Sequence, residues 1–209
     1  MDFEIVLSFF LTSVLLSAAP GPDILYVLAL SISKGARSAL TLALGLVSGI
    51  VAHTAICAAG LSILIVNSPK AFWCVKIFGA IYLAYLAYLA LREDPKKNAQ
   101  NASASNSEKK SLKNLYARGI MMNLLNPKVL LFFIAFLPQF TRQGTQLAIW
   151  LQIVILGAIF LLSALLVMGS VAILGAKLKP ILARGVFWVI EKYVRVAIFV
   201  SLALASLLC

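Results

Sequence analysis

Long apolar blocks alternate with short polar connections along almost the whole chain. A helix needs roughly 20 apolar residues to cross about 30 Å of hydrocarbon, and the blocks are near or above that length. They predict six transmembrane helices, over residues 5–33, 38–65, 72–91, 119–137, 147–174 and 185–208. Because tilt or a break must absorb the excess length of several blocks, we expect an all-α integral membrane protein whose spans are not all straight.

A polar segment over residues 92–118 separates the first three blocks from the last three. It contains no large apolar residue before Leu112, so it cannot bury enough apolar surface to order itself. We interpret it as a flexible linker between a first three-helix repeat, residues 1–91, and a second, residues 119–209. With three spans in each half, the two repeats would cross the membrane in opposite directions, as the inverted repeats of secondary transporters do.

The basic residues predict the orientation of these spans. The connections after the first, third and fifth spans carry twelve of them: Lys34, Arg37, Arg92, Lys96, Lys97, Lys109, Lys110, Lys113, Arg118, Lys177, Lys179 and Arg184. The opposite side carries Lys70 and Arg142. An excess of Lys and Arg marks the cytoplasmic side, so the linker would be cytoplasmic and both termini would lie outside. The net charge of +11 then reflects orientation rather than nucleic-acid binding.

Composition agrees with a membrane protein and offers no cofactor or metal site. Of the 209 residues, 62% are hydrophobic and 12% charged, with a mean hydropathy of +1.01, whereas a soluble domain is about 25% charged. Cys57, Cys74 and Cys209 lie in or at the ends of apolar blocks without metal-ligand spacing, which is typical of reduced structural thiols. Asp2 and Glu4 stand where a cleavable signal has basic residues, so we expect the first span to be retained.

The first span contains a break, in the run Ala18-Ala19-Pro20-Gly21-Pro22-Asp23. Pro20 and Pro22 lack the N–H groups that would pair with the carbonyls of Leu16 and Ala18, and Gly21 tolerates unusual backbone angles. The helix should end near Ala19 and restart near Asp23, whose carboxylate suits the cap of a helix start. Unpaired backbone groups at this depth are tolerated only inside the protein or beside a water-filled cavity.

The fourth span contains a matching break, in the run Asn123-Leu124-Leu125-Asn126-Pro127-Lys128. Asp23 is 11 residues from Lys34 and Lys128 is 10 from Arg118, so at 1.5 Å per residue both charges lie roughly 15 Å deep. Opposite charges at one depth can pair, and without a partner each would cost several kcal/mol. We therefore predict a central polar site formed by Pro20, Gly21, Pro22, Asp23, Asn123, Asn126, Pro127 and Lys128. The alternative is that this pair merely fastens two spans and that the amides are interhelical hydrogen-bonding groups.

His53 is the one histidine and lies toward the outer half of the second span. It is either a proton relay, together with Asp23, or a hydrogen-bonded packing residue. Gly45 and Gly49 precede it at the same spacing of four. Such small residues let helices approach closely, either inside the protein or in a homodimer, and the former is the simpler interpretation.

At these residues the chain resembles the LysE/RhtB family of bacterial amino-acid exporters. The resemblance rests on the run from Ala18 to Asp23, on Lys76-x-x-Gly79-Ala80-x-Tyr82-Leu83, and on Asn126-Pro127-Lys128 followed by Pro138-Gln139-Phe140. The Pro-Gly-Pro-Asp form is similar to the homoserine/threonine-exporter branch, although Ala87 stands where many members have glycine. The resemblance implies export of a small or neutral amino acid such as threonine, homoserine or leucine across the bacterial inner membrane, driven by the proton gradient.

A zwitterionic substrate suits the predicted site. Lys128 and the N–H groups after Pro22 would face its carboxylate. Its ammonium would face Asp23, the carbonyls of Leu16 and Ala18, and the amides of Asn123 and Asn126. Protonation of Asp23 would loosen its hold on Lys128 and on the substrate, which would couple export to proton entry.

Other classes of function fit the sequence less well. An inorganic or metal-ion exporter usually gathers several carboxylates or histidines, and Asp23 alone is central here. An intramembrane enzyme needs a nucleophile with a base, or a liganded metal. A membrane scaffold would not explain two broken helices.

Overall fold

The computed structural model describes residues 2–19, 21–61, 69–92, 111–142, 144–182 and 185–208. Every regular element in these segments is helical, as the sequence predicts. The elements are α1 (Phe3–Ala18), α2 (Pro22–Lys34), α3 (Ala36–Ile56), η1 (Cys57–Leu61), α5 (Pro69–Arg92), α7 (Leu112–Leu124), α8 (Pro127–Leu131), η2 (Phe132–Phe136), η3 (Leu137–Phe140), α9 (Ile149–Leu182) and α10 (Gly185–Leu208). The segments η1 and η2 are π-helical, and η3 is a 3-10 helix.

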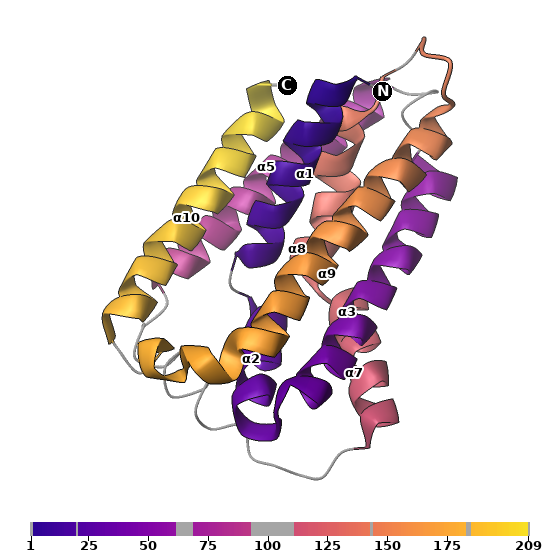
Figure 1. Cartoon of the computed structure of the whole chain (residues 1–209). Helices are drawn as coiled ribbons and strands as arrows, with labels where there is room; N and C mark the ends of the chain where they lie inside the picture. Colours follow the sequence, from indigo (N-terminus) through magenta and orange to yellow (C-terminus); the bar gives the residue numbers. More distant parts are fainter. Residues whose placement is uncertain are drawn as a thin grey trace.

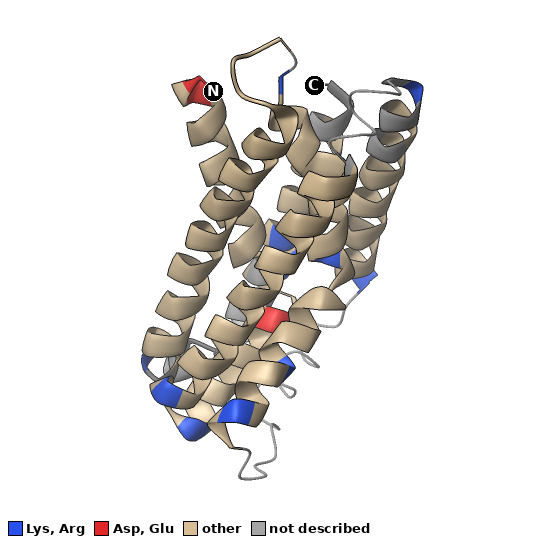
Figure 2. Ribbon diagram, turned by 90° about the vertical axis from the view of Figure 1, so that its right-hand side faces the viewer, with Lys and Arg blue, Asp and Glu red and all other residues tan. Residues whose placement is uncertain are grey.

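The helices form one elongated bundle (Figure 1). The start of α1 and the end of α10 lie at the same end of this bundle, and the lower ends of α2, α3 and α7 lie at the other. Lys and Arg gather at the end away from the termini (Figure 2). We call the end that carries the termini the outer end, a name for its place in the bundle and not for a side of the membrane, and the other the basic end.

Two described helices are each long and apolar enough to cross a membrane, over Ala36–Gly60 and Ile149–Gly175. Two bent pairs add up to two more: α1 with α2, bent by 61°, and the segment from Leu112 to Leu124 with that from Pro127 to Phe140, bent by 47°. A shorter apolar helix covers Ile77–Arg92. Both bends fall at the prolines that the sequence singles out, because a proline interrupts the backbone hydrogen-bond ladder.

The glycine face of α3 packs against α7. A Cβ atom at Gly45 would collide with the carbonyl of Tyr116, and one at Gly119 would lie 2.8 Å from the backbone nitrogen of Leu46. The two backbones are therefore in direct contact, which glycine at both positions permits. This face serves internal packing, as the simpler interpretation held, and a homodimer would have to use another face.

Two buried apolar clusters fill the bundle. The first joins α1, η2 and the first half of α9, with Phe9, Leu16, Phe133 and Phe160 among its members. The second joins α2, α3, α7 and the second half of α9, with Val27, Leu42, Leu115 and Ala172 among its members. Since α1 packs on α9 while α3 packs on both α7 and α9, elements from the two halves of the chain interleave.

The helix α7 begins earlier than the hydropathy pattern indicates. The side chain of Ser111 accepts a hydrogen bond of 3.3 Å from the backbone nitrogen of Asn114 and caps the helix. Residues 112–118 are therefore helical rather than part of a linker over 92–118, and residues 93–110 lie outside the described part of the chain. The early start is stabilised by Leu115, which is buried in the second cluster.

Candidate functional site

The first break separates α1 from α2. The helix α1 ends at Ala18 and α2 begins at Pro22, with Gly21 as its N-cap; Pro20 lies outside the described residues. Gly21 has extended backbone angles, φ −146° and ψ 178°, so it is not needed for an unusual conformation. A Cβ atom there would lie 2.8 Å from Asp23 Oδ1 and 3.4 Å from Lys128 Nζ. Gly21 therefore provides space for the charged pair, which corrects the reason that the sequence suggests for it.

Asp23 occupies the first turn of α2 and is 4% exposed. We expected its carboxylate to cap the helix, but the N-cap is Gly21 and no side-chain cap is present there. The helix starts one residue earlier than predicted because proline is well suited to the first helical position. The Oδ1 atom of Asp23 has no hydrogen-bond partner among the described residues and lies 3.9 Å from Lys128 Nζ.

The second break separates α7 from α8. Asn126 is the N-cap of α8, and its Oδ1 accepts a hydrogen bond of 3.0 Å from the backbone nitrogen of Lys128. Pro127 follows at the first helical position and Lys128 at the second, which repeats the order of Gly21, Pro22 and Asp23. The two breaks therefore place one residue of each charge at equivalent positions of two helix starts.

The ammonium group of Lys128 closes the first break. Its Nζ donates hydrogen bonds to the carbonyls of Leu16, at 3.2 Å, and Ala19, at 3.0 Å, besides its ion pair with Asp23. Lys128 is 6% exposed, so this buried cation is compensated by one carboxylate and two carbonyl oxygens. The predicted meeting of Asp23 and Lys128 is confirmed. The carbonyl pair is Leu16 and Ala19 instead of Leu16 and Ala18, and it is bound by Lys128 rather than left open.

His53 and Asn123 meet at the second break. His53 Nε2 donates to the backbone carbonyl of Asn123 at 3.2 Å, and the same carbonyl accepts from the backbone nitrogen of Asn126 at 3.0 Å. The imidazole also lies 5.7 Å from the ring of Phe133, between centroids. His53 is therefore a hydrogen-bonded packing residue in this structure. The side chain of Asn123 rests on Gly49, and its Oδ1 is buried without a hydrogen-bond partner among the described residues.

A small cavity lies at the junction of the two apolar clusters. Its free volume is about 20 Å³, enough for a water molecule but far below the size of an amino acid. Four polar residues and eight apolar ones line it: Ser17, Asp23, Asn123, Lys128, Leu16, Leu46, Val47, Ile50, Val129, Phe160, Ala164 and Met168. The predicted residues Asp23, Asn123 and Lys128 thus share one cavity, while Asn126 stands behind Lys128 as its cap.

Sequence reasoning missed Ser17. This serine is buried, lines the cavity, and has an Oγ atom without a hydrogen-bond partner in the described part of the chain. The signal was present as a hydroxyl three residues before Pro20 in an otherwise apolar run. It was weak because serine occurs often in apolar helices, where it bonds to its own backbone.

Phenylalanine side chains pack between the cavity and the outer end. Phe132 is central: its ring centroid lies 5.9 Å from that of Phe9, 5.2 Å from Phe136 and 5.0 Å from Phe160. Phe140 extends the cluster, with its centroid 5.0 Å from that of Phe9. The rings come from α1, η2, η3 and α9, and Phe160 among them also lines the cavity.

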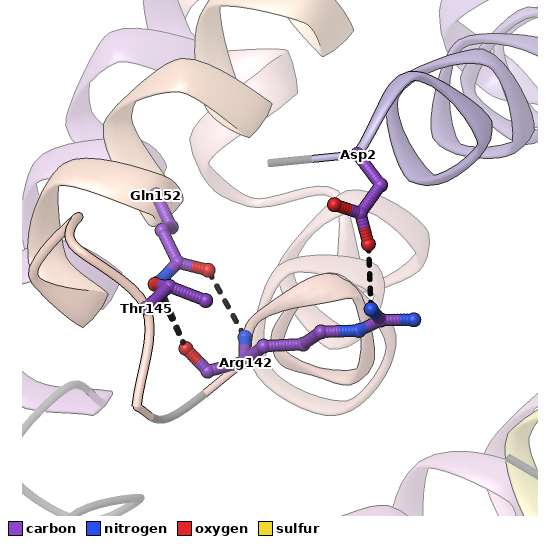
Figure 3. Close-up of polar contacts among 4 residues, drawn as sticks. All are labelled: Asp2, Arg142, Thr145 and Gln152. Carbon is purple, nitrogen blue, oxygen red and sulfur yellow. Dashed lines mark hydrogen bonds and ion pairs between the residues drawn. The ribbon is translucent and has the colours of Figure 1, made fainter.

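Polar contacts among Asp2, Arg142, Thr145 and Gln152 lie at the outer end of the bundle (Figure 3). Gln152 accepts from the backbone nitrogen of Arg142 at 3.0 Å and donates to its carbonyl at 2.9 Å, and it also donates to Thr145 Oγ1. Arg142 in turn forms an exposed ion pair with Asp2, with 2.6 Å between Nη1 and Oδ2. These contacts hold the connection between η3 and α9 and join it to the start of α1.

Toward the basic end, α2 packs against α9 and α7. Ser31 donates to the carbonyl of Ala172 at 2.7 Å, and Gly175 leaves space for the Ser31 side chain. The guanidinium of Arg118 lies over the ring of Tyr26, 4.4 Å from its centroid. These contacts hold α2 against α9 and α7 near the basic end of the bundle.

The described residues contain no group of three His, Cys, Asp or Glu side chains that could hold a metal ion.

Asp23 and Lys128 form a buried pair of opposite charge, and such a pair can bind a group that carries both charges. The arrangement is suited to recognition of a zwitterion, with donors and acceptors already assembled at two helix breaks.

The sequence of this chain is similar to those of known membrane proteins. The family model described as LysE type translocator matches residues 14–208. A homoserine/homoserine lactone efflux protein of Salmonella typhimurium is 33% identical over 179 residues, 85% of this chain and 84% of the relative. An uncharacterized membrane protein of Vibrio cholerae is 31% identical over 160 residues, 75% of this chain and 74% of the relative.

A threonine efflux protein of Escherichia coli K12 is 29% identical over 115 residues, 55% of this chain and 56% of the relative. No solved structure matches the chain. The similarity to named relatives thus extends over most of the sequence in one case and over about half in another.

Proposed function

This chain belongs to the LysE type translocator family, and we propose that it is a secondary transporter that exports a small or neutral amino acid from the cytoplasm in exchange for protons. The observation that carries the proposal is the buried arrangement of Asp23, Lys128 and the carbonyls of Leu16 and Ala19. The names of two relatives, which specify efflux of homoserine and of threonine, support an amino-acid substrate.

Lys128 occupies the place that a substrate ammonium would need. An ammonium group has three N–H donors, and Lys128 Nζ is offered one carboxylate and two carbonyl oxygens. The α-ammonium of an amino acid could bind the same acceptors. The α-carboxylate of that amino acid would then hold the displaced Lys128, so no buried charge would be left without a partner.

Protons enter the cycle at Asp23. When Asp23 is ionised, it holds either Lys128 or the substrate ammonium. When a proton from outside neutralises it, the attraction for the substrate ammonium weakens and the amino acid is released. Asp23 thus binds the substrate ammonium and a proton in turn. His53 is a second candidate for the relay, because it is hydrogen-bonded to the break that carries Lys128.

The two halves act as inverted repeats of three spans each, residues 1–91 and 119–209, joined by the linker. The contacts support this proposal: α1 packs on α9 as α7 packs on α3, while α5 packs on α10. The starts of α2 and α8 repeat the order of cap, proline and charged residue. With six spans, the gathering of basic residues at one end (Figure 2) supports a cytoplasmic basic end and termini outside the bacterial inner membrane.

Transport requires the cavity to open alternately toward each end. At about 20 Å³ it does not admit an amino acid, so it must widen before a substrate can bind. The bends at the two breaks are the natural hinges, because their backbone ladders are already interrupted. Separation of α2 from α9 would open the basic end, and separation of the phenylalanine rings would open the outer end.

Counterflow into vesicles tests the proposal. The purified full-length protein is reconstituted into liposomes that are preloaded with unlabelled threonine, homoserine or leucine, and uptake of the same labelled amino acid is measured. We expect uptake above protein-free vesicles for at least one of the three, and loss of that uptake in Asp23→Asn and Lys128→Ala.

Asp2→Asn is the matched control, since it removes an equal charge at an exposed position. Variants are compared at equal reconstituted amounts after their size-exclusion profiles are shown to match. Normal counterflow by both central variants would exclude the site. To test proton coupling, an outside-acid pH gradient is imposed on vesicles loaded with the labelled substrate, and it should accelerate efflux severalfold in the wild-type protein.

A further inference from the structure

One hydroxyl in the cavity behaves differently from the other helical hydroxyls. Ser17 is 4% exposed, lines the cavity with Asp23 and Lys128, and its Oγ has no hydrogen-bond partner among the described residues. Burial of a hydroxyl without a partner is unfavourable. A group of this kind in a cavity points to a ligand that supplies the missing hydrogen bond.

The missing hydrogen bond of Ser17 is not a general property of hydroxyl groups in these helices. Many helical hydroxyls in the structure donate to the carbonyl four residues earlier: Ser13, Ser33, Thr41, Ser48, Thr54, Ser163 and Ser170. Ser17 has the carbonyl of Ser13 at the equivalent position of the same helix, yet makes no such bond. Its hydroxyl is therefore available to the cavity.

We infer that Ser17 is a specificity-determining residue, whose hydroxyl forms a hydrogen bond with a hydroxyl group on the side chain of the exported amino acid. This inference rests on the proposed function. The α-ammonium and α-carboxylate of the substrate are matched by Asp23, the two carbonyls and Lys128. Ser17 is the polar group on α1 that remains, and it both donates and accepts, as a hydroxyl partner requires.

The surroundings of Ser17 suit a small side chain. The apolar lining of the cavity comes from α1, α3, α8 and α9, with Leu16, Leu46, Val129 and Phe160 among its residues. Such a wall accommodates carbon atoms, and a single hydroxyl on it discriminates by polarity rather than by size. Asn123 Oδ1, from α7, is also without a partner, but a carbonyl oxygen only accepts and can serve the ammonium equally well.

Isosteric substrate pairs isolate this contact. Threonine and valine differ by one hydroxyl in place of one methyl group, and so do homoserine and norvaline. A site built to bind a substrate hydroxyl rejects an analogue that lacks it, because polar groups are then left unpaired. For one neutral hydrogen bond, the preference should be roughly five- to tenfold in apparent affinity.

The experiment measures how unlabelled threonine, valine, homoserine and norvaline inhibit counterflow of labelled threonine in vesicles with the full-length protein. The readout is the ratio of inhibition constants within each pair. We expect Ser17→Ala to reduce the ratio of at least one pair to near one, chiefly by weakening the hydroxylated member. Ser13→Ala is the matched control, since Ser13 is also buried on α1 and its hydroxyl bonds to Phe9; it should keep both ratios.

Thermal unfolding distinguishes a role in specificity from a role in folding, because the two predict opposite changes in Tm for Ser17→Ala. Ser17→Ala removes an unpaired buried hydroxyl and introduces a better helix former, so its Tm should equal or exceed that of the wild-type protein. Ser13→Ala removes a satisfied hydrogen bond and should not raise the Tm more than Ser17→Ala does. A role of Ser17 in folding alone would instead lower the Tm and leave the ratios unchanged.

Results that contradict the role of Ser17 differ from results that contradict the proposed function. If the wild-type protein shows no preference within either pair, or if Ser17→Ala keeps the wild-type ratios, the inference is wrong and the proposed function stands. An equal loss of affinity for both members would place Ser17 on the shared backbone of the substrates and also overturn it. Absence of counterflow with threonine, homoserine and leucine would overturn the proposed function and this inference together.

Discussion

The two proline breaks interrupt their helices in the same way but are closed differently. At the second break, the Asn126 side chain accepts from the backbone nitrogen of Lys128, and the carbonyl of Asn123 accepts from His53 and from the backbone nitrogen of Asn126. At the first break, the cap is a glycine, and the carbonyls of Leu16 and Ala19 are bound by Lys128. The backbone groups named at the second break are thus bound by neighbouring residues, whereas the carbonyls at the first depend on a cation from the other half of the chain.

This difference indicates which break can exchange partners. Breaking the contacts of Asn126 and His53 would expose backbone groups that a substrate has no reason to match. The acceptors at the first break already hold an ammonium group, and another ammonium group can replace it. We therefore regard the first break as the part of the site that changes partners and the second as the fixed support for Lys128.

Replacement of Lys128 should have the largest effect. Lys128→Met leaves the Asp23 carboxylate and two carbonyls buried without a cation, and breaking a buried pair in this way costs about 3–5 kcal/mol. We expect export to fall to background and the Tm to drop markedly. The double variant Asp23→Asn, Lys128→Met carries no uncompensated charge, so it should recover part of the Tm while export stays at background.

Thermal unfolding in detergent and vesicle counterflow measure the two effects separately. Recovery of export in the double variant would mean that the pair only fastens the spans. A Tm that is the same in the single and double variants would mean that Asp23 and Lys128 are not energetically coupled.

Gly21→Ala should come next, with an effect on export rather than on folding. The backbone angles of Gly21 suit alanine, but the new Cβ atom would lie 2.8 Å from Asp23 Oδ1 and 3.4 Å from Lys128 Nζ. Crowding of this kind costs about 1–3 kcal/mol, so we expect export to fall about tenfold. Counterflow rates at equal protein amounts provide the measurement.

Gly169→Ala is the matched control for that substitution. Gly169 lies within α9, and a Cβ atom there would meet nothing within 4 Å. Export should be unchanged and the Tm unchanged or slightly raised, because alanine is the better helix former. If Gly21→Ala exported as fast as Gly169→Ala, the first break would have more room around the pair than the structure indicates.

The meeting of Asp23 and Lys128 could be predicted from the sequence because two simple physical rules determine it. A proline inside a helix removes one backbone hydrogen bond, and depth follows from residue counts, so Asp23 and Lys128 could be matched across the chain. The carbonyls could not be predicted with the same accuracy. Which oxygen faces Lys128 depends on where α1 ends, and its end at Ala18 exchanges the expected Ala18 carbonyl for that of Ala19.

Other features required the packing of the helices. Hydropathy ends the fourth span near Gly119, yet α7 continues back to Leu112 because α3 covers Leu115 and meets Gly119. The sequence likewise does not reveal that Phe9, Phe132 and Phe160 face one another instead of lipid. Ser17 was missed for the same reason: whether a helical hydroxyl bonds to its own backbone or faces a cavity depends on the neighbouring helices.

Replacement of Asn126 should have the smallest effect and separates the two roles of its amide. Asn126→Ala removes the cap of α8, which costs about 1 kcal/mol, and should lower the Tm modestly and slow export less than Gly21→Ala does. Asn126→Ser keeps an oxygen that can accept from Lys128 and should restore most of the Tm. It does not replace Asn126 Nδ2, which has no hydrogen-bond partner among the described residues. If Asn126→Ser folds and exports normally, the second break is purely a support. If it folds normally but exports as slowly as Asn126→Ala, the amide nitrogen contacts the substrate, and the second break also exchanges partners.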